Sequence, residues 1–404
     1  MKMRVTFTFD THAMQHPRYL TLVPPKKRIY EIQPDPIYDP IRTFTTAHST
    51  RGYPFRLVKL MHATGVKMLG LPSSGPGVLK RSFLATGGLY LALDIGHPDL
   101  AIRQSFGDFT AGFSHQFGVG IAVMSVSQAY RIRWDTLVAQ PVGRKPTLDY
   151  QAPLAGGNWL EVEAKGVTSS ASGNKARRDI YHKKHPSQPH PSSATGIQTA
   201  KLGMIVQAVR RDRVSVGDTI RKRAKEPDQA TLEIIDPVGG HEDAAKREVS
   251  QRAGQYWHYV GAAIFAGLYD VARELIARAD ALLQGRTRKP QLHHLRFLER
   301  AALPIAHRNV IGIQWRPSDR AELPDDVWFY QAIDREVIRT ILVDDVFPEV
   351  EPYHYDSPDA LHKASEYAES LFPDGSYFGM GTTRREALRT LYPHDIQIKD
   401  LQYE

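Results

Sequence analysis

The chain of 404 residues is too long for one small hydrophobic core, so two or three domains are expected. Hydrophobic residues make up 42% of it and charged residues 24%, as in ordinary globular proteins, and no run approaches the roughly eighteen apolar residues that a membrane span needs. Cysteine is absent, which excludes disulfides, cysteine-bound zinc and thiol nucleophiles. With no apolar signal-peptide region at the N-terminus, a cytoplasmic protein is expected.

Excess positive charge is confined to one part of the chain. The net charge is +8, and residues 166–225 contain 13 Lys or Arg residues against 3 acidic ones, whereas the rest of the chain has 39 basic and 41 acidic residues. A solvated basic surface would produce such a run. Binding to a polyanion such as nucleic acid would also explain it, since cations that neutralise phosphates supply most non-specific affinity.

The two ends of the chain predict different kinds of structure. Residues 1–107 contain short β-like runs, such as 19–23, broken by Pro and Gly, and predict a β-rich N-terminal domain. Residues 286–404 predict a mixed C-terminal domain, with a strand at 310–315 and a helix at 327–342.

Between them, residues 108–285 predict an α/β core. It begins with an amphipathic helix at 113–134 and ends with the longest helical pattern of the chain, at 242–284, which its internal glycines could bend or break. Gly285 is the expected stop of this long helix. The polar stretch at 169–195 predicts a long loop.

Residues 159–166 predict a strand with chemistry on one face. Alternation places the apolar side chains on one side: Leu160, Val162 and Ala164. The other side receives Trp159, Glu161, Glu163 and Lys165. Charges on a covered face are costly unless they are paired or bind a metal. The simpler interpretation is a solvated face on a two-layer hairpin.

A further carboxylate precedes this strand. Asp149 lies fourteen residues before Glu163, on the other side of a Gly156-Gly157 turn, so an antiparallel hairpin can bring the two together. The two carboxylates, the Ala164 carbonyl and waters would give Mg²⁺ the oxygen ligands that it prefers. Lys165 would then orient the attacking water or neutralise charge on the phosphate.

The segments Lys145-Pro146-Thr147-Leu148-Asp149 and Trp159-Leu160-Glu161-Val162-Glu163-Ala164-Lys165-Gly166 resemble the signature of the PD-(D/E)XK nuclease superfamily. The resemblance implies a restriction-endonuclease-like fold, with a mixed central sheet flanked by helices, and phosphodiester hydrolysis that depends on Mg²⁺ or Mn²⁺. It assigns Asp149, Glu163 and Lys165 to the family's metal-ligand and catalytic-lysine roles.

Two positions depart from the family pattern. Leu148, not Pro, precedes Asp149, at a position that varies in such enzymes. Many members also place a Glu on the preceding helix, but residues 113–133 contain no acid. Gln128 or His115 would take that auxiliary role, or it is missing, and Glu161 is a further auxiliary candidate.

The expected partner is nucleic acid, DNA rather than RNA. Six cations of the basic window are the expected phosphate contacts: Lys175, Arg177, Arg178, Lys183, Lys184 and Lys201. A homodimer or a partner protein would suit double-strand cleavage, although no sequence feature requires one. By analogy alone, the flanking domains suggest substrate choice in restriction or antiviral defence.

Two other functions compete with a nuclease. Glu161 and Glu163, two apart on a strand, could be the paired carboxylates of a glycosidase, but the neighbouring Lys165 and the basic flank suit phosphate better than sugar. The alternative from another class is a catalytically inactive nucleic-acid-binding or assembly protein that retains the nuclease fold. The missing helix Glu favours it, whereas retention of Asp149, Glu163 and Lys165 favours activity.

Overall fold

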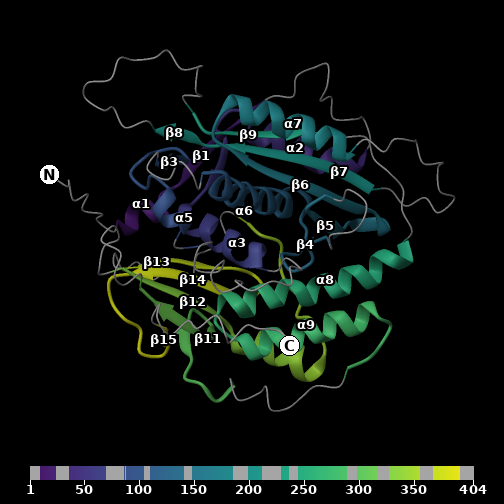
Figure 1. The fold of residues 1–404 in the computed structure, drawn as a ribbon, viewed down its shortest axis with the longest axis vertical. Helices are drawn as coiled ribbons and strands as arrows, with labels where there is room; N and C mark the ends of the chain where they lie inside the picture. Colours follow the sequence, from purple (N-terminus) through teal and green to yellow (C-terminus); the bar gives the residue numbers. More distant parts are fainter. Residues whose placement is uncertain are drawn as a thin grey trace.

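The computed structural model describes residues 10–23, 36–69, 86, 88–103, 110–140, 148–184, 199–211, 229–235, 244–288, 298–316, 327–354 and 367–391. These residues form two main β-sheets, with helices between the sheets and outside them (Figure 1). One cluster of buried apolar side chains runs from Met14 to Met380 and includes residues of both sheets. Elements of both sheets therefore share one continuous core, beside which two smaller apolar clusters lie.

The central sheet has seven strands and is mixed, as expected. In spatial order they are β2 (Tyr53–Phe55), β1 (Arg18–Val23), β9 (Thr231–Ile235), β7 (Thr199–Gln207), β6 (Trp159–Val167), β5 (Tyr150–Pro153) and β4 (Val138–Ala139). The β6–β7 and β1–β9 pairs are parallel, and the other neighbours are antiparallel. Strands β1 and β2, from the predicted N-terminal domain, thus belong to the same sheet as the strands of the predicted α/β core.

The N-terminal region is mostly helical in its described residues, which corrects the expectation of a β-rich domain. Its helices are α1 (Thr11–Gln15), the 3-10 turn η1 (Pro36–Tyr38), α2 (Asp39–His48), α3 (Leu57–Leu69) and α5 (Leu89–Ala92). Its strands β1 and β2 extend the central sheet, and β3 (Ala101–Arg103) pairs with β8 (Val209–Arg211). In α3 every residue except Met68 is buried, so this helix lacks the one-sided apolar pattern that predicts a helix from sequence.

Two helices cover opposite faces of the central sheet (Figure 1). Helix α6 (Thr110–Tyr130) confirms a helix in the stretch 113–134, but its residues 113–127 are buried on nearly all sides, so it is not the amphipathic helix that was expected. It lies on the face that carries Leu160, Val162 and Ala164. Helix α7 (Ser170–Lys184) lies on the other face, where Glu161, Glu163 and Lys165 are found. The side chains of the candidate site therefore lie on a face that α7 partly covers.

Helix α7 occupies most of the stretch expected to be a loop. Ser169 caps its start, because the Ser169 hydroxyl accepts a hydrogen bond from the Ser172 N–H at 3.2 Å. Ala176 and Ile180 then pack on the sheet through a small apolar cluster. Such a short apolar stripe does not show in a segment of otherwise polar composition, and the part of the expected loop from 185 to 195 lies outside the described residues.

Helix α6 crosses β6 at very short range because two glycines face each other. A Cβ on Gly118 would lie 2.3 Å from the Gly166 nitrogen, and a Cβ on Gly166 would lie 1.5 Å from the Ser114 carbonyl oxygen. The absent side chains allow the helix to contact the strand backbone directly. Residues around Gly118 are thereby held behind the Lys165–Gly166 end of β6.

We expect Gly166→Ala to lower the free energy of unfolding by at least the ~1–3 kcal/mol that overpacking usually costs, because the opposing atom is backbone and cannot rotate away. Gly173→Ala in α7 is the matched control, since the nearest atom would lie 3.9 Å from its Cβ. It should be neutral or stabilising by about 0.5–1 kcal/mol. Urea unfolding measures both, and equal effects would contradict the close crossing.

The second sheet is antiparallel apart from one pair. Its strands are β10 (Leu303–Ile305), β11 (Arg308–Trp315), β12 (Trp328–Asp334), β14 (Ser376–Gly381) and β13 (Tyr367–Leu371), with β15 (Arg389–Leu391) parallel to β11. The helix expected at 327–342 is instead β12 followed by the short α10 (Arg335–Arg339) and the π-helical turn η6 (Thr340–Asp344). Nearly all of β12 is buried, so its sequence has no period-2 alternation.

The long helix expected at 242–284 is two helices, α8 (Ala244–Phe265) and α9 (Tyr269–Leu283). Gly267 breaks it with a φ of 68°, and Gly285, also at 68°, follows the end of α9 as expected. Helices α3 and α8 lie between the two sheets in Figure 1, and both supply residues to the shared core. The apolar side chains of these two helices therefore connect the two sheets.

Candidate active site

The β5–β6 hairpin brings Asp149 beside Glu163, as the sequence predicts. The 3-10 turn η4 (Ala155–Gly157) joins the two strands, and its Gly156 and Gly157 have φ values of 73° and 77°. Pairing runs from Pro153↔Trp159 to Tyr150↔Val162, and one further step of this register places Asp149 opposite Glu163. At that step the Asp149 carboxylate, not a strand carbonyl, accepts the Ala164 N–H at 2.9 Å.

Glu163 and Lys165 form an ion pair next to this carboxylate. The Glu163 side chain is fully buried, and its Oε1 lies 2.5 Å from the Lys165 Nζ. Burial lowers the pKa of Lys165, but the carboxylates of Glu163, Asp149 and, on α7, Asp179 raise it, so the net pKa is above its ordinary value. The ammonium therefore stays charged, in the field of both site carboxylates.

The donor set suits a hard divalent cation. Mg²⁺ usually keeps several waters and takes only one or two protein carboxylates, and Asp149 and Glu163 supply two. In an antiparallel ladder the N–H and C=O of one residue point to the same neighbour, so the Ala164 carbonyl faces the Asp149 side together with its N–H. No group of three or more His, Cys, Asp or Glu residues that could hold a metal ion occurs within the described ranges.

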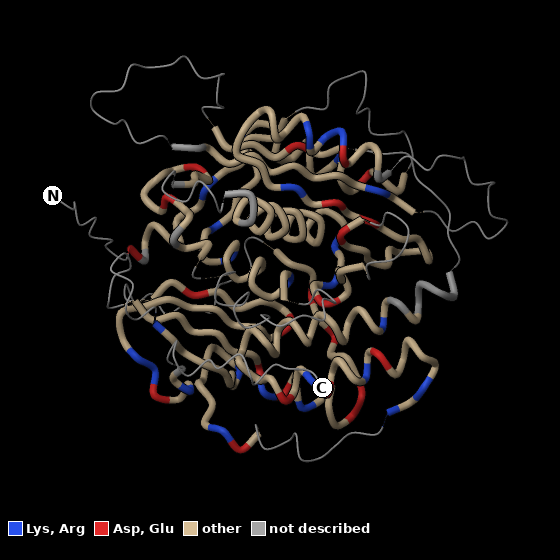
Figure 2. Tube along the Cα trace, viewed as in Figure 1, with Lys and Arg blue, Asp and Glu red and all other residues tan. Residues whose placement is uncertain are grey.

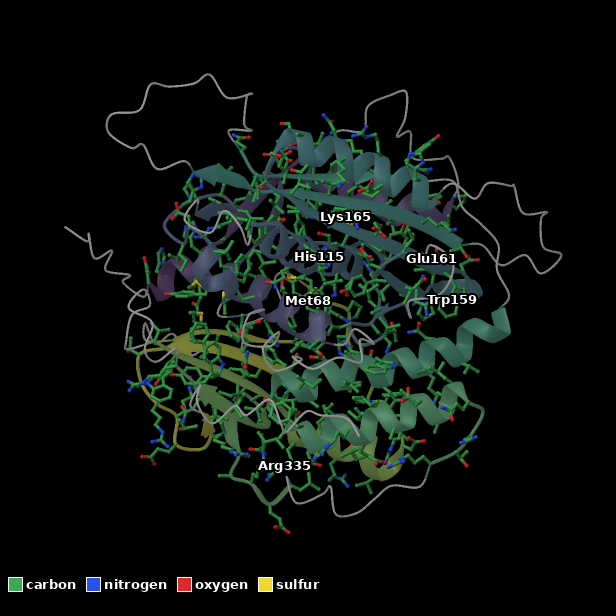
Figure 3. All side chains as sticks on the ribbon, viewed as in Figure 1. Met68, His115, Trp159, Glu161, Lys165 and Arg335 are labelled. Carbon is green, nitrogen blue, oxygen red and sulfur yellow. The ribbon has the colours of Figure 1, made fainter. Side chains whose placement is uncertain are left out.

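The auxiliary candidates lie on different elements, and Figure 3 labels two of them, His115 and Glu161, together with Lys165. His115 follows Ser114, whose carbonyl lies against Gly166, so it is at the crossing of α6 and β6. Gln128 is ten residues beyond Gly118, or about 15 Å further along α6. Glu161 points to the same face as Glu163 but lies 3.8 Å from the Lys201 ammonium on β7. His115 and Gln128 are thus both on α6, which covers the opposite face of the sheet from Glu163 and Lys165.

The six expected phosphate contacts fall into three groups: two exposed cations, two cations paired with carboxylates, and two whose side chains are not described. Lys175 and Arg178 are exposed on α7, where Figure 2 shows cations along the helix. Arg177 points inward and donates hydrogen bonds to both carboxylate oxygens of the buried Glu233, at 2.6–2.8 Å. Lys201 is mostly buried beside Glu161. The side chains of Lys183 and Lys184 lie outside the described residues.

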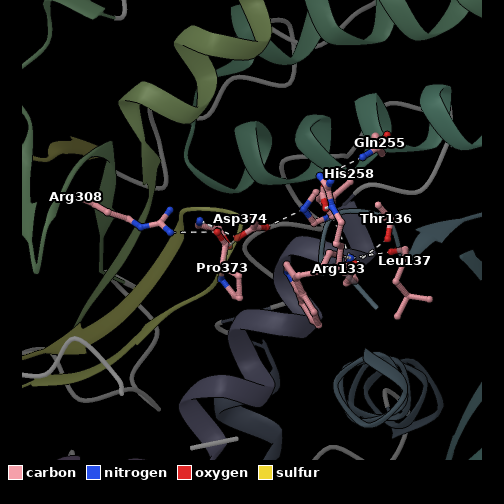
Figure 4. A network of polar contacts seen from close by, with 12 residues as sticks. Arg133, Thr136, Leu137, Gln255, His258, Arg308, Pro373 and Asp374 are labelled. Atoms are coloured by element: carbon pink, nitrogen blue, oxygen red, sulfur yellow. Dashed lines mark hydrogen bonds and ion pairs between the residues drawn. The ribbon is translucent and has the colours of Figure 1, made fainter. Parts of the chain in front are cut away.

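A buried charge network was not anticipated from the sequence (Figure 4). The Lys67 ammonium on α3 donates to the carbonyls of Trp134 and Leu137 at 2.6 and 2.8 Å and lies 3.2 Å from the His258 Nδ1 on α8. The His258 Nε2 lies 2.8 Å from Asp374, in the turn between β13 and β14. None of Lys67, His258 and Asp374 is more than 4% exposed, so the network lies in the interior of the protein.

The protonation of this network follows from its geometry. Burial lowers the pKa of Lys67 to about 7, and burial together with the Lys67 charge lowers the pKa of His258. A neutral His258 can then accept from Lys67 through Nδ1 and donate to Asp374 through Nε2. Burial raises the pKa of Asp374, but the bonds from His258 and Ser376 outweigh it and leave that pKa well below its ordinary value.

Among the helices of the described ranges, none combines the length and apolarity that crossing a bilayer requires. Comparison with known proteins finds no matching family model, no matching curated protein and no matching solved structure.

Proposed function

We propose that the chain is a metal-dependent nuclease, built on a restriction-endonuclease-like core of the PD-(D/E)XK type, that hydrolyses phosphodiester bonds of DNA with Mg²⁺ or Mn²⁺. The observation that carries the proposal is the bond from the Ala164 N–H to the Asp149 carboxylate, at the point where β5 stops pairing with β6. It brings two acidic residues and the charged Lys165 together at one strand end.

Each residue has a role that its contacts support. Asp149, Glu163 and the Ala164 carbonyl would hold the cation, which when bound would stabilise phosphate charge and lower the pKa of a water. The Lys165 ammonium would stabilise negative charge that develops on the phosphate oxygens. Among the auxiliary candidates, Glu161 is the one that shares the face of β6 with Glu163.

One observation favours the second candidate, an inactive nucleic-acid-binding or assembly protein. Three carboxylates on the α7-covered face each lie within 4 Å of a cation of the chain itself: Glu161 with Lys201, Glu163 with Lys165 and Glu233 with Arg177. Each of these three carboxylates is thus paired with a cation without a metal ion. Such an arrangement would also serve to fix α7 on the sheet.

Digestion of single-stranded, duplex and supercoiled DNA with and without Mg²⁺ separates the two candidates. A nuclease should cleave at least one substrate only with the metal, and chelation should stop it. Mg²⁺ should also raise the thermal unfolding temperature, because an ion that binds only the folded state stabilises it, by about 2.7 kcal/mol at a hundred times its Kd. A protein that neither cleaves DNA nor is stabilised by Mg²⁺ fits the second candidate, the inactive nucleic-acid-binding or assembly protein.

Lys165→Met tests the role of the ammonium. We expect Mg²⁺ to raise the unfolding temperature at least as much as in the wild type, because Lys165 competes with the metal for Glu163. Cleavage at saturating Mg²⁺ should fall by roughly 100-fold, the loss typical of one missing electrostatic contact to the transition state. Wild-type turnover by this variant would exclude Lys165 from the chemistry.

A further inference from the structure

Helix α7 has two faces of different character. Gly173, Ala176 and Ile180 are buried toward the sheet, and Arg177 reaches Glu233 beneath the helix. The opposite face is exposed along its described length and carries Lys175, Arg178, Asp179, Tyr181 and His182. Among the described elements, α7 packs on β6 and β7.

The exposed face places an aromatic ring in line with two cations. Lys175, Arg178 and Tyr181 follow one another at intervals of three residues, which puts them on one side of the helix, about 4.5 Å apart along its axis. Tyr181 is 46% exposed. Single exposed aromatic residues are common on protein surfaces, so it is the alignment with Arg178 and Lys175 that indicates a binding surface.

The row of Lys175, Arg178 and Tyr181 combines two ways of binding nucleic acid. Cations contact phosphates of paired and unpaired strands alike. An aromatic ring stacks on the flat face of a base, and such stacking is used by proteins that bind single strands without sequence preference. In a duplex the base faces are already covered by their neighbours. A ring at this position therefore adds affinity for unpaired bases and little for a duplex.

The row lies close to the candidate active site. Helix α7 packs on β6, the strand that carries Glu163 and Lys165, and Ile180 packs with Ile205 on the sheet below. Two inner cations, Arg177 and Lys201, are already paired with carboxylates. Among the described side chains of α7, Lys175 and Arg178 are the cations exposed to solvent.

We propose that the outer row of α7 binds a single-stranded segment of DNA, with Lys175 and Arg178 on phosphates and Tyr181 stacked on a base. The inference rests on the proposed function for the reaction, and it narrows the substrate of that nuclease to unpaired strands or to duplexes with an unpaired segment. Tyr181 then contributes to the choice of substrate.

Binding is measured with fluorescent strands on the Glu163→Gln background without Mg²⁺, so that cleavage does not interfere. The probes are oligothymidylate, an abasic strand of equal length and a hairpin duplex. Tyr181→Ala should weaken binding of oligothymidylate about tenfold, within the range that one base–aromatic stack contributes. It should leave the abasic strand and the hairpin unchanged, and Tyr181→Phe should retain the full affinity.

The matched control is Tyr19→Ala, since Tyr19 on β1 is 47% exposed and lies off α7. Arg178→Gln should weaken all three probes alike and lower the salt dependence of binding. If Tyr181→Ala behaves like Tyr19→Ala on oligothymidylate, or if the hairpin binds more tightly than oligothymidylate, the proposal is wrong. DNA cleavage by the wild type is measured separately. A protein that does not cleave DNA contradicts the proposed nuclease function, whereas a Tyr181→Ala variant that binds oligothymidylate normally contradicts the proposed single-strand surface.

Discussion

Glu163→Gln is expected to abolish Mg²⁺-dependent cleavage while leaving the fold intact. Gln has nearly the same shape, so the buried position beneath α7 stays filled. The substitution removes one of the two charges that would hold the cation, and the remaining carboxylate of Asp149 already accepts the Ala164 N–H. We expect at least a 100-fold loss of cleavage, because removing even one electrostatic contact to the transition state costs about 10²–10³.

Two measurements make this result specific to the site. Mg²⁺ should no longer raise the unfolding temperature of Glu163→Gln, which reports binding independently of catalysis. Glu233→Gln is the control, since Glu233 is likewise buried and ion-paired on the α7-covered face, but on β9. It should keep its cleavage and its response to Mg²⁺. If Glu163→Gln cleaves at the wild-type rate, the catalytic site is elsewhere in the chain.

Asp374→Ala should be among the most destabilising single substitutions in this protein, costing about 3–5 kcal/mol of unfolding free energy. It removes the carboxylate that accepts from His258, from the Ser376 N–H and from the Ser376 hydroxyl, all in the interior. The buried charge of Lys67 would then lose its counter-charge. Asp270→Ala is the control, because its ion pair with Arg273 is exposed and should contribute within about 1 kcal/mol.

The same network predicts how stability depends on pH. The folded-state pKa values of Asp374, His258 and Lys67 all lie below their ordinary values. The unfolded chain therefore binds more protons, so stability rises with pH in each window. It should fall as the pH drops below 6.5 for His258 and below 3.8 for Asp374, and increase between about 7 and 10.5 for Lys67. Lys67→Met should remove the increase at high pH, as measured by urea unfolding at several pH values.

The candidate site was accessible from sequence because its signals are local. Side chains alternate between the two faces of a strand, which places Glu163 and Lys165 on the same face. The Gly156-Gly157 turn defines the hairpin that brings this strand beside Asp149. No local sequence pattern indicates the buried charge network of Lys67, His258 and Asp374. The residues joined to His258 lie 191 and 116 positions away along the chain. Lys67 lies in a mostly apolar stretch, and Asp374 lies in a Pro-Asp-Gly-Ser sequence that by itself predicts only a turn.

Elements with unusual burial were the ones that sequence patterns missed. Helix α3 and strand β12 are buried nearly all round, which removes the periodicity that distinguishes a helix from a strand. Helix α7 was missed for the opposite reason. Its buried face consists of the small set Gly173, Ala176 and Ile180, which is hard to recognise in a segment of polar composition. The pairing of β1 with β9 joins segments whose residues Thr21 and Gln229 are 208 positions apart.

That last pairing bears on how the protein is made. At about 5–20 residues per second, a ribosome needs roughly ten to forty seconds to go from β1 to β9. During that interval the β1–β2 pair lacks its neighbour β9, and an unpaired strand edge is prone to aggregate. Expression at low temperature or with chaperones should therefore improve the yield. A truncated chain that starts at residue 108 would leave β9 as a bare edge of the sheet.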